Sequence, residues 1–119
     1  MNTDSILTSV KKLLGITEEC TDFDADIIIH INSALMILTQ LGVGPIEGFS
    51  IQDKTVLWAN FLGKDNQKLE SVKSYVYMKV RLMFDPPSSS AVMESMNRMI
   101  SELEWRLNVA ADLDNSVGD

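Results

Sequence analysis

The chain has 119 residues, with 17 acidic and 10 Lys or Arg side chains, so its formal net charge is −7. This length fits one domain with a modest core. The acidic balance argues against a protein that grips nucleic acid, because such binding needs Lys and Arg to displace counterions. The single cysteine, Cys20, excludes an intrachain disulfide and fits a reducing cytoplasm. With no signal-peptide order and no apolar run near the ~20 residues that cross a bilayer, we expect a soluble chain without membrane contact.

Apolar side chains at helical spacing predict the first helix over residues 4–14 and the second over residues 23–41. Asp4 is a candidate cap for the first helix, and Gly15 is a candidate stop. The second helix has a continuous apolar stripe and further apolar residues on the opposite side, so it should bury or present two faces. These further residues are Ile29 and Met36.

The segment 42–51, "GVGPIEGFSI", has the glycines and proline of a loop but is too apolar for a plain solvated one. A short, mostly apolar helix is predicted after it, over residues 52–62, and should be buried on most sides. The apolar loop side chains either fold back onto this helix or meet a neighbouring protein. They are Val43, Ile46, Phe49 and Ile51.

The fourth helix is predicted over residues 66–84 and again has two apolar stripes, on opposite sides at 100° per residue. Two-sided apolar helices in so small a chain fit a subunit that buries surface against its neighbours. The main stripe consists of Leu69, Val72, Val76, Val80 and Met83. The second stripe, whose residues are candidates for an interface, consists of Tyr75, Met78 and Leu82.

The fifth helix is predicted over residues 89–108, with its apolar stripe on one face and Trp105 on the opposite, charged face. Either Trp105 anchors a partner, or another helix of the same chain covers it. Val109 projects from the same charged side. Residues 109–119 lack a helical period and are predicted to form a flexible acidic tail after a helical domain of residues 1–108.

"RLMFDPPSSSAVM", residues 81–93, joins the fourth and fifth helices. Asp85 precedes a proline, which excludes it from helical geometry and ends the fourth helix. Pro86 and Pro87 then fix two φ angles, and the serines that follow can cap the next helix. A flexible linker would use Gly and Ser instead, so we interpret this stretch as a rigid corner within one domain.

No motif for catalysis, metal binding or cofactor binding survives inspection. "DFDAD", residues 22–26, has the spacing of the first ligands of a calcium-binding EF-hand loop. That loop also needs a glycine and a glutamate where this chain has Ile27 and Ser33. With one histidine, His30, and one cysteine, nucleophilic or metal chemistry lacks partners. We therefore expect an all-α bundle of about five helices that is not an enzyme and takes no cofactor.

"KSYVYMKVRLMFDPPSSS", residues 73–90, and "ISELEWRLNV", residues 100–109, resemble the phage head–tail connector, or adaptor, family. "LTSVKKLLGI", residues 7–16, and "GVGPIEGF", residues 42–49, are similar to the same family. The resemblance covers roughly residues 4–109. Its motifs are short and mostly structural, so no catalytic residue is carried over.

The resemblance implies a virion protein that is made in the host cytoplasm and sits at the capsid–tail junction. Members of the family form a ring, typically dodecameric, beneath the portal protein. The ring extends the DNA channel and docks a head-completion or tail protein. Their C-terminal segments tend to engage the portal. The acidic charge of this chain fits a channel wall that lets DNA pass without specific binding, and it equally fits ordinary solubility. The alternative function is a small helical regulator that binds a host protein.

Overall fold

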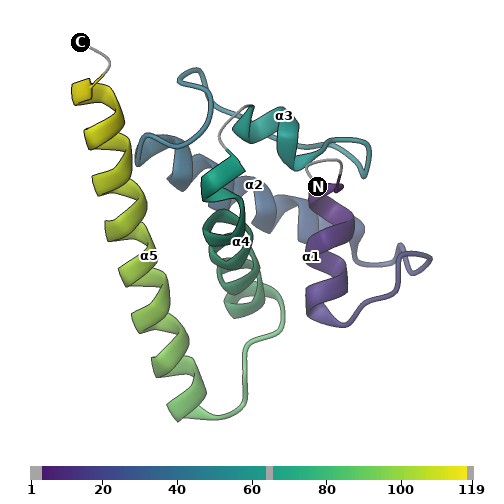
Figure 1. Ribbon diagram of the computed structural model, residues 1–119. Helices are drawn as coiled ribbons and strands as arrows, with labels where there is room; N and C mark the ends of the chain where they lie inside the picture. The colour runs from purple at the N-terminus through teal and green to yellow at the C-terminus, as the bar shows by residue number, and fades with distance from the viewer. Residues whose placement is uncertain (1–3, 64–65, 118–119) are drawn as a thin grey trace.

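The structure, a computed structural model, describes residues 4–63 and 66–117. Within them the secondary structure is helical, apart from one isolated β-bridge between Ser5 and Leu57. The all-α expectation is confirmed. The elements in chain order are α1 (Ile6–Leu14), α2 (Asp24–Gln40), α3 (Trp58–Leu62), the short 3-10 helix η1 (Asn66–Lys68), α4 (Leu69–Phe84) and α5 (Ser90–Val117) (Figure 1).

Helix α4 is the centre of the packing. It contacts α1, α2 and α5, and in Figure 1 it lies between α5 and α1, with α2 crossing behind it. This position explains why both of its apolar stripes are needed: one helix cannot cover both sides of α4. Its buried side chains are Leu69, Val72, Tyr75, Val76, Met78 and Val80.

The start of α1 is held by Ser5 rather than by Asp4. The Ser5 hydroxyl oxygen accepts a hydrogen bond from the Thr8 backbone N–H at 3.2 Å, which satisfies one of the free donors of the first turn. Asp4 instead contributes its backbone carbonyl, which accepts from the Trp58 N–H at 3.0 Å. The N-terminal segment is thereby paired with the chain that leads into α3.

Helix α3 is shorter than the predicted 52–62, because residues 52–55 form bends and a turn and residues 56–57 pair with the N-terminal segment. The Val56 carbonyl accepts a hydrogen bond from the Ile6 N–H at 3.0 Å. This bond and the one from the Trp58 N–H flank the isolated bridge between Ser5 and Leu57. Backbone groups used in this pairing are not available for a helix. The prediction of a helix over residues 52–57 is therefore wrong, while its buried character is confirmed by Trp58 and Phe61.

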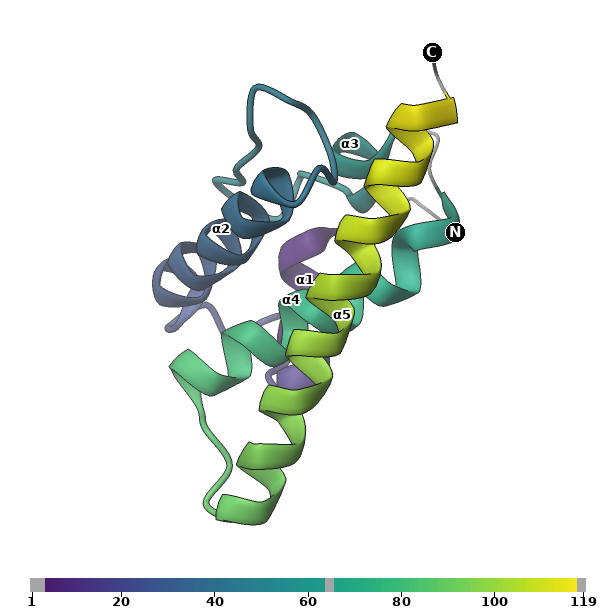
Figure 2. The ribbon, with the colours of Figure 1, turned by 90° about the vertical axis from the view of Figure 1, so that its left-hand side faces the viewer.

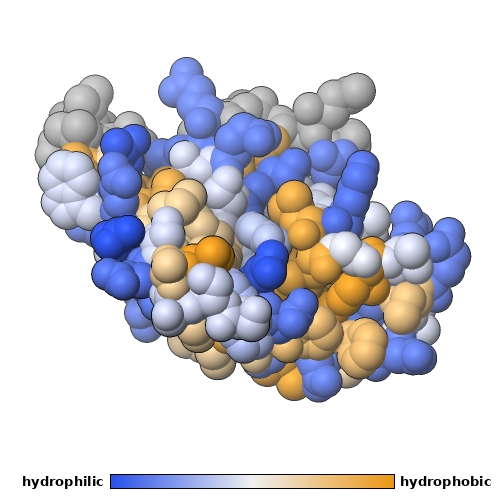
Figure 3. Space-filling view, turned by 90° about the horizontal axis from the view of Figure 1, so that it is seen from below, coloured by the Kyte–Doolittle hydropathy of each residue, from blue (hydrophilic) through white to orange (hydrophobic). Residues whose placement is uncertain are grey.

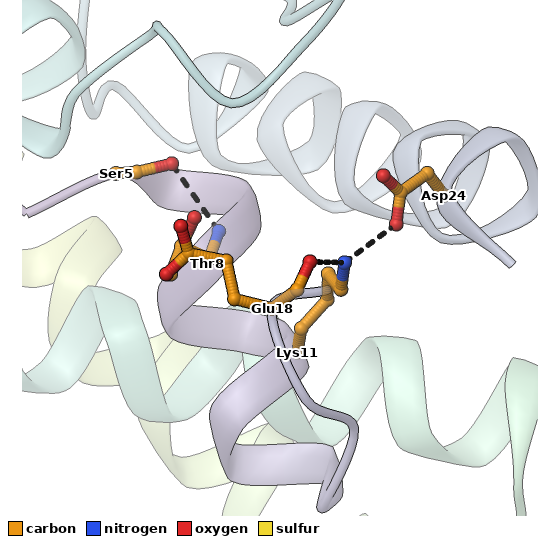
Figure 4. Close-up of polar contacts among 5 residues, drawn as sticks. All are labelled: Ser5, Thr8, Lys11, Glu18 and Asp24. Carbon is orange, nitrogen blue, oxygen red and sulfur yellow. Dashed lines mark hydrogen bonds and ion pairs between the residues drawn. The ribbon is translucent and has the colours of Figure 1, made fainter. Parts of the chain in front are cut away.

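Lys11 on α1 is buried, with 3% of its surface exposed. Its ammonium nitrogen lies 2.9 Å from the Asp24 Oδ1 atom at the start of α2 and donates to the Glu18 carbonyl at 3.1 Å (Figure 4). A buried ammonium is costly unless it is paired and hydrogen-bonded. Lys11 therefore joins α1, the following loop and α2 at one point.

Helix α5 continues through Val117, so residues 109–117, which the sequence analysis assigned to a tail, are helical. Ala111 is buried, and the Asn108 side-chain amide donates to the Leu41 carbonyl at 3.2 Å. A Cβ atom placed on Gly42 would lie only 2.8 Å from the Ala111 Cβ. The small residues let the end of α5 approach the end of α2 closely. Residues 118–119 of the predicted tail lie outside the described residues.

Candidate interaction surfaces

The outer face of α5 presents Trp105, of which 68% is exposed. It lies opposite the stripe of α5 that packs on the rest of the chain, as the sequence predicts. The charged residues nearby form ion pairs between positions i and i+4 of the helix. Arg106 pairs with Glu102 at 2.7 Å, and Arg98 pairs with Glu94 at 3.3 Å. The alternative in which another helix of the same chain covers Trp105 does not hold. Val109, one turn further on, is half-buried.

The outer face of α2 presents the two apolar residues that the sequence placed opposite its main stripe. Ile29 is 61% exposed and Met36 is 59% exposed. They are seven residues apart, two turns along the same side of the helix. Asp22 and Asp26 are exposed near the start of α2. This side of α2 is therefore an acidic surface with an apolar strip.

The loop between α2 and α3 divides its apolar side chains between the core and the surface. Val43 and Ile51 are buried, whereas Ile46 is 96% exposed. Phe49 is half-buried and packs on Phe61 with ring centroids 5.2 Å apart. Val43, Phe49 and Ile51 thus pack within the chain, whereas Ile46 remains exposed and available to a neighbouring protein.

Asn32 of α2 holds this loop in place. Its side-chain oxygen accepts from the Ile51 N–H at 2.7 Å, and its amide donates to the Ile51 carbonyl at 3.0 Å. As a result, Ile51 lies in the core and is not available to a partner, contrary to the interface prediction. Between the loop and α2 there is an open hollow of about 550 Å³. It is lined by Asn32, Met36, Ile46, Glu47 and Phe49, among others.

The second stripe of α4 is not an interface in this structure. Tyr75 and Met78 are buried and Leu82 is half-buried. The interface prediction for Tyr75 and Met78 is therefore wrong, and Leu82 is only partly accessible. The physical reason is that α5 folds back onto α4 and covers this side. The apolar periodicity of α4 showed that its second stripe must be buried. It could not show that a helix of the same chain buries it.

One polar contact crosses the α4–α5 boundary. The Tyr75 hydroxyl donates to the Glu104 Oε2 atom at 2.7 Å. Burial raises the pKa of the Tyr75 hydroxyl above its ordinary value, and the hydrogen bond to the Glu104 carboxylate and the charge of that group raise it further. Tyr75 therefore stays protonated and remains a donor throughout the physiological range.

The predicted end of α4 at Asp85 is confirmed. Asp85 has φ −148° and ψ 71°, which is outside helical geometry, and α4 ends at Phe84. The Ser89 hydroxyl oxygen accepts from the Val92 N–H at 3.3 Å, so it caps α5. The corner turns the chain so that α5 runs back along α4 (Figure 2).

The end of the molecule that carries this corner has an apolar surface that the sequence analysis missed. Phe23 is 45% exposed and contacts the ring of Phe84 edge-on at 5.4 Å. Met83, expected within the main stripe of α4, is 67% exposed because it lies in the last turn, beside the corner. Leu13, at the end of α1, is half exposed. Figure 3 shows apolar surface over this end, broken by polar side chains.

Among residues 4–63 and 66–117, no group of three or more His, Cys, Asp or Glu side chains is placed to hold a metal ion. In that same part of the chain, no helix is both long and apolar enough to cross a membrane. What the described surface offers instead is several exposed apolar areas on different faces.

A comparison with protein-family models identifies the family of this chain. The family model for the phage connector protein matches residues 6–114. The chain therefore belongs to the phage connector protein family, which gives it a structural role in a phage connector and implies association with other components of the phage particle. A search of curated proteins and a search of solved structures returned no significant match.

Proposed function

We propose that this chain is a head–tail connector of a tailed phage, a structural protein without catalytic activity that works in the virion. Copies of it, twelve in the typical arrangement, form a ring beneath the portal protein. The ring extends the DNA channel and docks a head-completion or tail protein. The observation that carries this proposal is the family match over residues 6–114, nearly the whole chain.

The surface chemistry supports the proposal. A ring subunit needs at least two surfaces for its neighbours, and a connector needs further ones for the proteins above and below. Apolar side chains are exposed on α2, on the loop after it, on the corner end and on α5. A net charge of −7 disfavours tight binding to DNA phosphates, so DNA can pass through the channel without specific contacts.

Trp105 is the residue that we assign to attachment. Its exposed indole is the largest apolar side chain on the outer face of α5, and loss of a central interface tryptophan typically costs ~2 kcal/mol or more of binding free energy. It lies near the C-terminal end of the chain, where connectors of this kind engage the portal. We propose that Trp105 contacts the portal protein.

The test is attachment of the purified full-length chain to phage heads that carry the portal but lack tails. We expect a ring beneath the portal in electron microscopy of these heads. Trp105→Ala should reduce the attached amount about tenfold or more at equal concentration while the far-UV circular dichroism stays unchanged. Met99→Ala is the matched control, because Met99 is a half-exposed apolar residue on another side of α5.

The results separate the parts of the proposal. If the Trp105→Ala variant still attaches to heads as the wild type does, Trp105 does not contact the portal, but the connector function stands. Failure of the wild-type chain to bind heads at any concentration, together with capture of a single host protein, would replace the connector with the regulator that the sequence left as an alternative.

A further inference from the structure

The outer side of α2 leads along an apolar strip into an open hollow. Ile29 is 61% exposed and Met36 is 59% exposed, and their separation of seven residues places them about 10 Å apart along the helix axis. Met36 also lines the hollow of about 550 Å³ between α2 and the loop that follows it, together with Ile46 and Phe49. We call these four residues the α2 face.

The wall of the hollow opposite α2 is fixed by contacts within the chain. Asn32 pairs with both backbone groups of Ile51, and Phe49 packs on Phe61 with ring centroids 5.2 Å apart. Ile46, between these fixed points, is 96% exposed. A loop that is held at its base loses little further freedom when a partner covers it, so the α2 face is preorganised for binding.

The charges around the α2 face are acidic. Residues 13–53, which contain α2 and the loop, include seven of the 17 acidic side chains and none of the 10 Lys and Arg. Asp22 and Asp26 lie exposed at the start of α2, and Glu47 is the charged residue among the described residues that line the hollow. Within the part of the chain that the structure describes, none of these three carboxylates forms an ion pair.

The basic residues closest to this segment along the chain are engaged on another side of α2. Lys11 pairs with Asp24 at 2.9 Å. Lys54 lines a separate hollow that also contains Asp24 and Ile28. The Lys and Arg of α1 and α4 belong to helices that pack against the buried side of α2. A partner that covers the α2 face must therefore supply the positive charge itself.

A second copy of this chain matches that chemistry poorly. Helices α1 and α4 contain five Lys or Arg, but their apolar stripes are buried in the core of the same chain. The hollow between them is lined by Asp4 and Glu70 as well as by Lys12 and Lys73, so its charges balance. Helix α5 has five acidic residues and two Arg. Duplex DNA, which is itself negative, is repelled.

We propose that the α2 face binds an amphipathic helix of another protein, one whose apolar stripe is flanked by Lys or Arg. A helix advances about 10 Å in seven residues, so apolar side chains at its positions i and i+7 meet Ile29 and Met36. The next one enters the hollow beside Ile46, while the basic side chains lie near the carboxylates. Charge of this kind selects the partner, and apolar burial supplies much of the affinity.

The test uses a synthetic probe and the full-length chain. The probe is a peptide of about 18 residues in which Leu forms one side of a helix and Lys forms the rest. One matched peptide has Glu in place of every Lys, and another has the same Leu and Lys in an order without a stripe. Fluorescence anisotropy at about 0.15 M salt measures the dissociation constants. We expect the Leu/Lys helix to bind about tenfold more tightly than either matched peptide.

Apolar variants locate the binding surface. Ile29→Ser with Met36→Ser should raise the dissociation constant of the Leu/Lys helix about tenfold or more, because both side chains lose their contact with the probe. The matched control is Met83→Ser with Val92→Ser, which removes two exposed apolar side chains at the corner end and should leave binding unchanged. Circular dichroism of each variant excludes unfolding as the cause of a loss.

Charge variants separate local attraction from the overall negative charge. Asp22→Asn with Asp26→Asn should raise the dissociation constant about threefold at low salt, and by less at high salt. Glu94→Gln with Glu102→Gln changes the net charge of the chain equally, but on α5, and should have a smaller effect.

Photo-cross-linking compares three surfaces of the same molecule directly. Benzophenone in place of one Leu of the probe inserts preferentially into methionine side chains. Met36 on α2, Met83 at the corner end and Met99 on α5 are all exposed, by 59%, 67% and 49%. We expect mass spectrometry to find the probe mainly on Met36.

Several results would overturn the proposal. They are equal binding of the Leu/Lys and Leu/Glu helices, no binding of either, equal losses in the α2-face and control variants, and cross-links mainly on Met83 or Met99. Loss of self-association by Ile29→Ser with Met36→Ser in sedimentation velocity would assign the face to a second copy instead. The proposal concerns a surface of the single subunit, so attachment to portal-bearing heads decides separately whether the connector function stands.

Discussion

The Tyr75 hydroxyl donates a 2.7 Å hydrogen bond to the Glu104 carboxylate, and this contact joins the central helix α4 to the helix that folds back along it. Tyr75 is fully buried and Glu104 is half-buried. A neutral donor on a charged acceptor is among the stronger protein hydrogen bonds. This pair adds a directional contact to the apolar packing of Met96, Ile100 and Leu107 that holds α5 in place.

Tyr75→Phe should lower the free energy of unfolding by about 1–2 kcal/mol, since the ring remains and only the hydrogen bond is lost. Glu104→Gln keeps an acceptor and should cost less. Denaturant unfolding at pH 7 measures both. Equal stability of the wild type and Tyr75→Phe would show that the contact contributes nothing net.

The same pair predicts a pH dependence. The folded-state pKa of Tyr75 is raised above its ordinary value of 10.0, so the protonated hydroxyl is favoured by folding. Its contribution is fully present below pH 10 and is lost as the pH rises from there towards the folded-state pKa. The melting temperature of the wild type should fall more steeply above pH 10 than that of Tyr75→Phe. Parallel curves for the two proteins would contradict this assignment.

Gly42 and Ala111 provide a test of the close approach between the ends of α2 and α5. Gly42 has φ +95°, and an added Cβ would lie 2.8 Å from the Ala111 Cβ. Gly42→Ala should therefore destabilise the fold by about 1–3 kcal/mol for the backbone strain and by a further amount for the clash. The matched control is Gly48→Ala, since Gly48 has φ +99° and nothing within 4 Å of the added Cβ. Thermal unfolding that is equal for both variants would exclude a contribution from the contact.

Lys11 and Asp24 form a buried ion pair. Removing the charge of only one partner should lower the free energy of unfolding. Lys11→Met leaves the Asp24 carboxylate without its cation, and we expect a loss of about 2–4 kcal/mol, moderated because Asp24 is 26% exposed. The double variant Lys11→Met with Asp24→Asn should be more stable than Lys11→Met alone. A double-mutant cycle from denaturant unfolding measures the coupling, and additive losses would show that the pair is not coupled.

The corner at Pro86 and Pro87 should matter more for assembly than for the fold. Replacing both by glycine lowers the stability of the folded chain slightly, because the unfolded chain gains conformational freedom. It also loosens the angle between α4 and α5, to which a closed ring has little tolerance. We expect helix content near that of the wild type and weaker self-association in sedimentation. Unchanged association would show that packing between α4 and α5 is sufficient to set the angle.

The sequence by itself determined the helical class, the first, second and fourth helices to within about three residues, and the corner at Asp85. These features depend on local physics: apolar spacing, capping side chains and the fixed φ of proline. It also separated the two sides of α2 correctly and placed Trp105 opposite the packed stripe of α5. The far end of α5 could have been found in the same way, because Ala111 continues the stripe one turn after Leu107.

Only the tertiary structure decided which apolar side chains are buried within the chain and which remain exposed. Periodicity shows that a side chain needs cover, but it carries no information about which element supplies the cover. Tyr75 and Met78 are therefore core residues, because α5 returns along α4, whereas Ile29 and Met36 remain exposed on the outer face of α2. The extended pairing of residues 56–58 with residues 4–6, and the burial of Lys11 beside Asp24, likewise depend on contacts between distant parts of the chain.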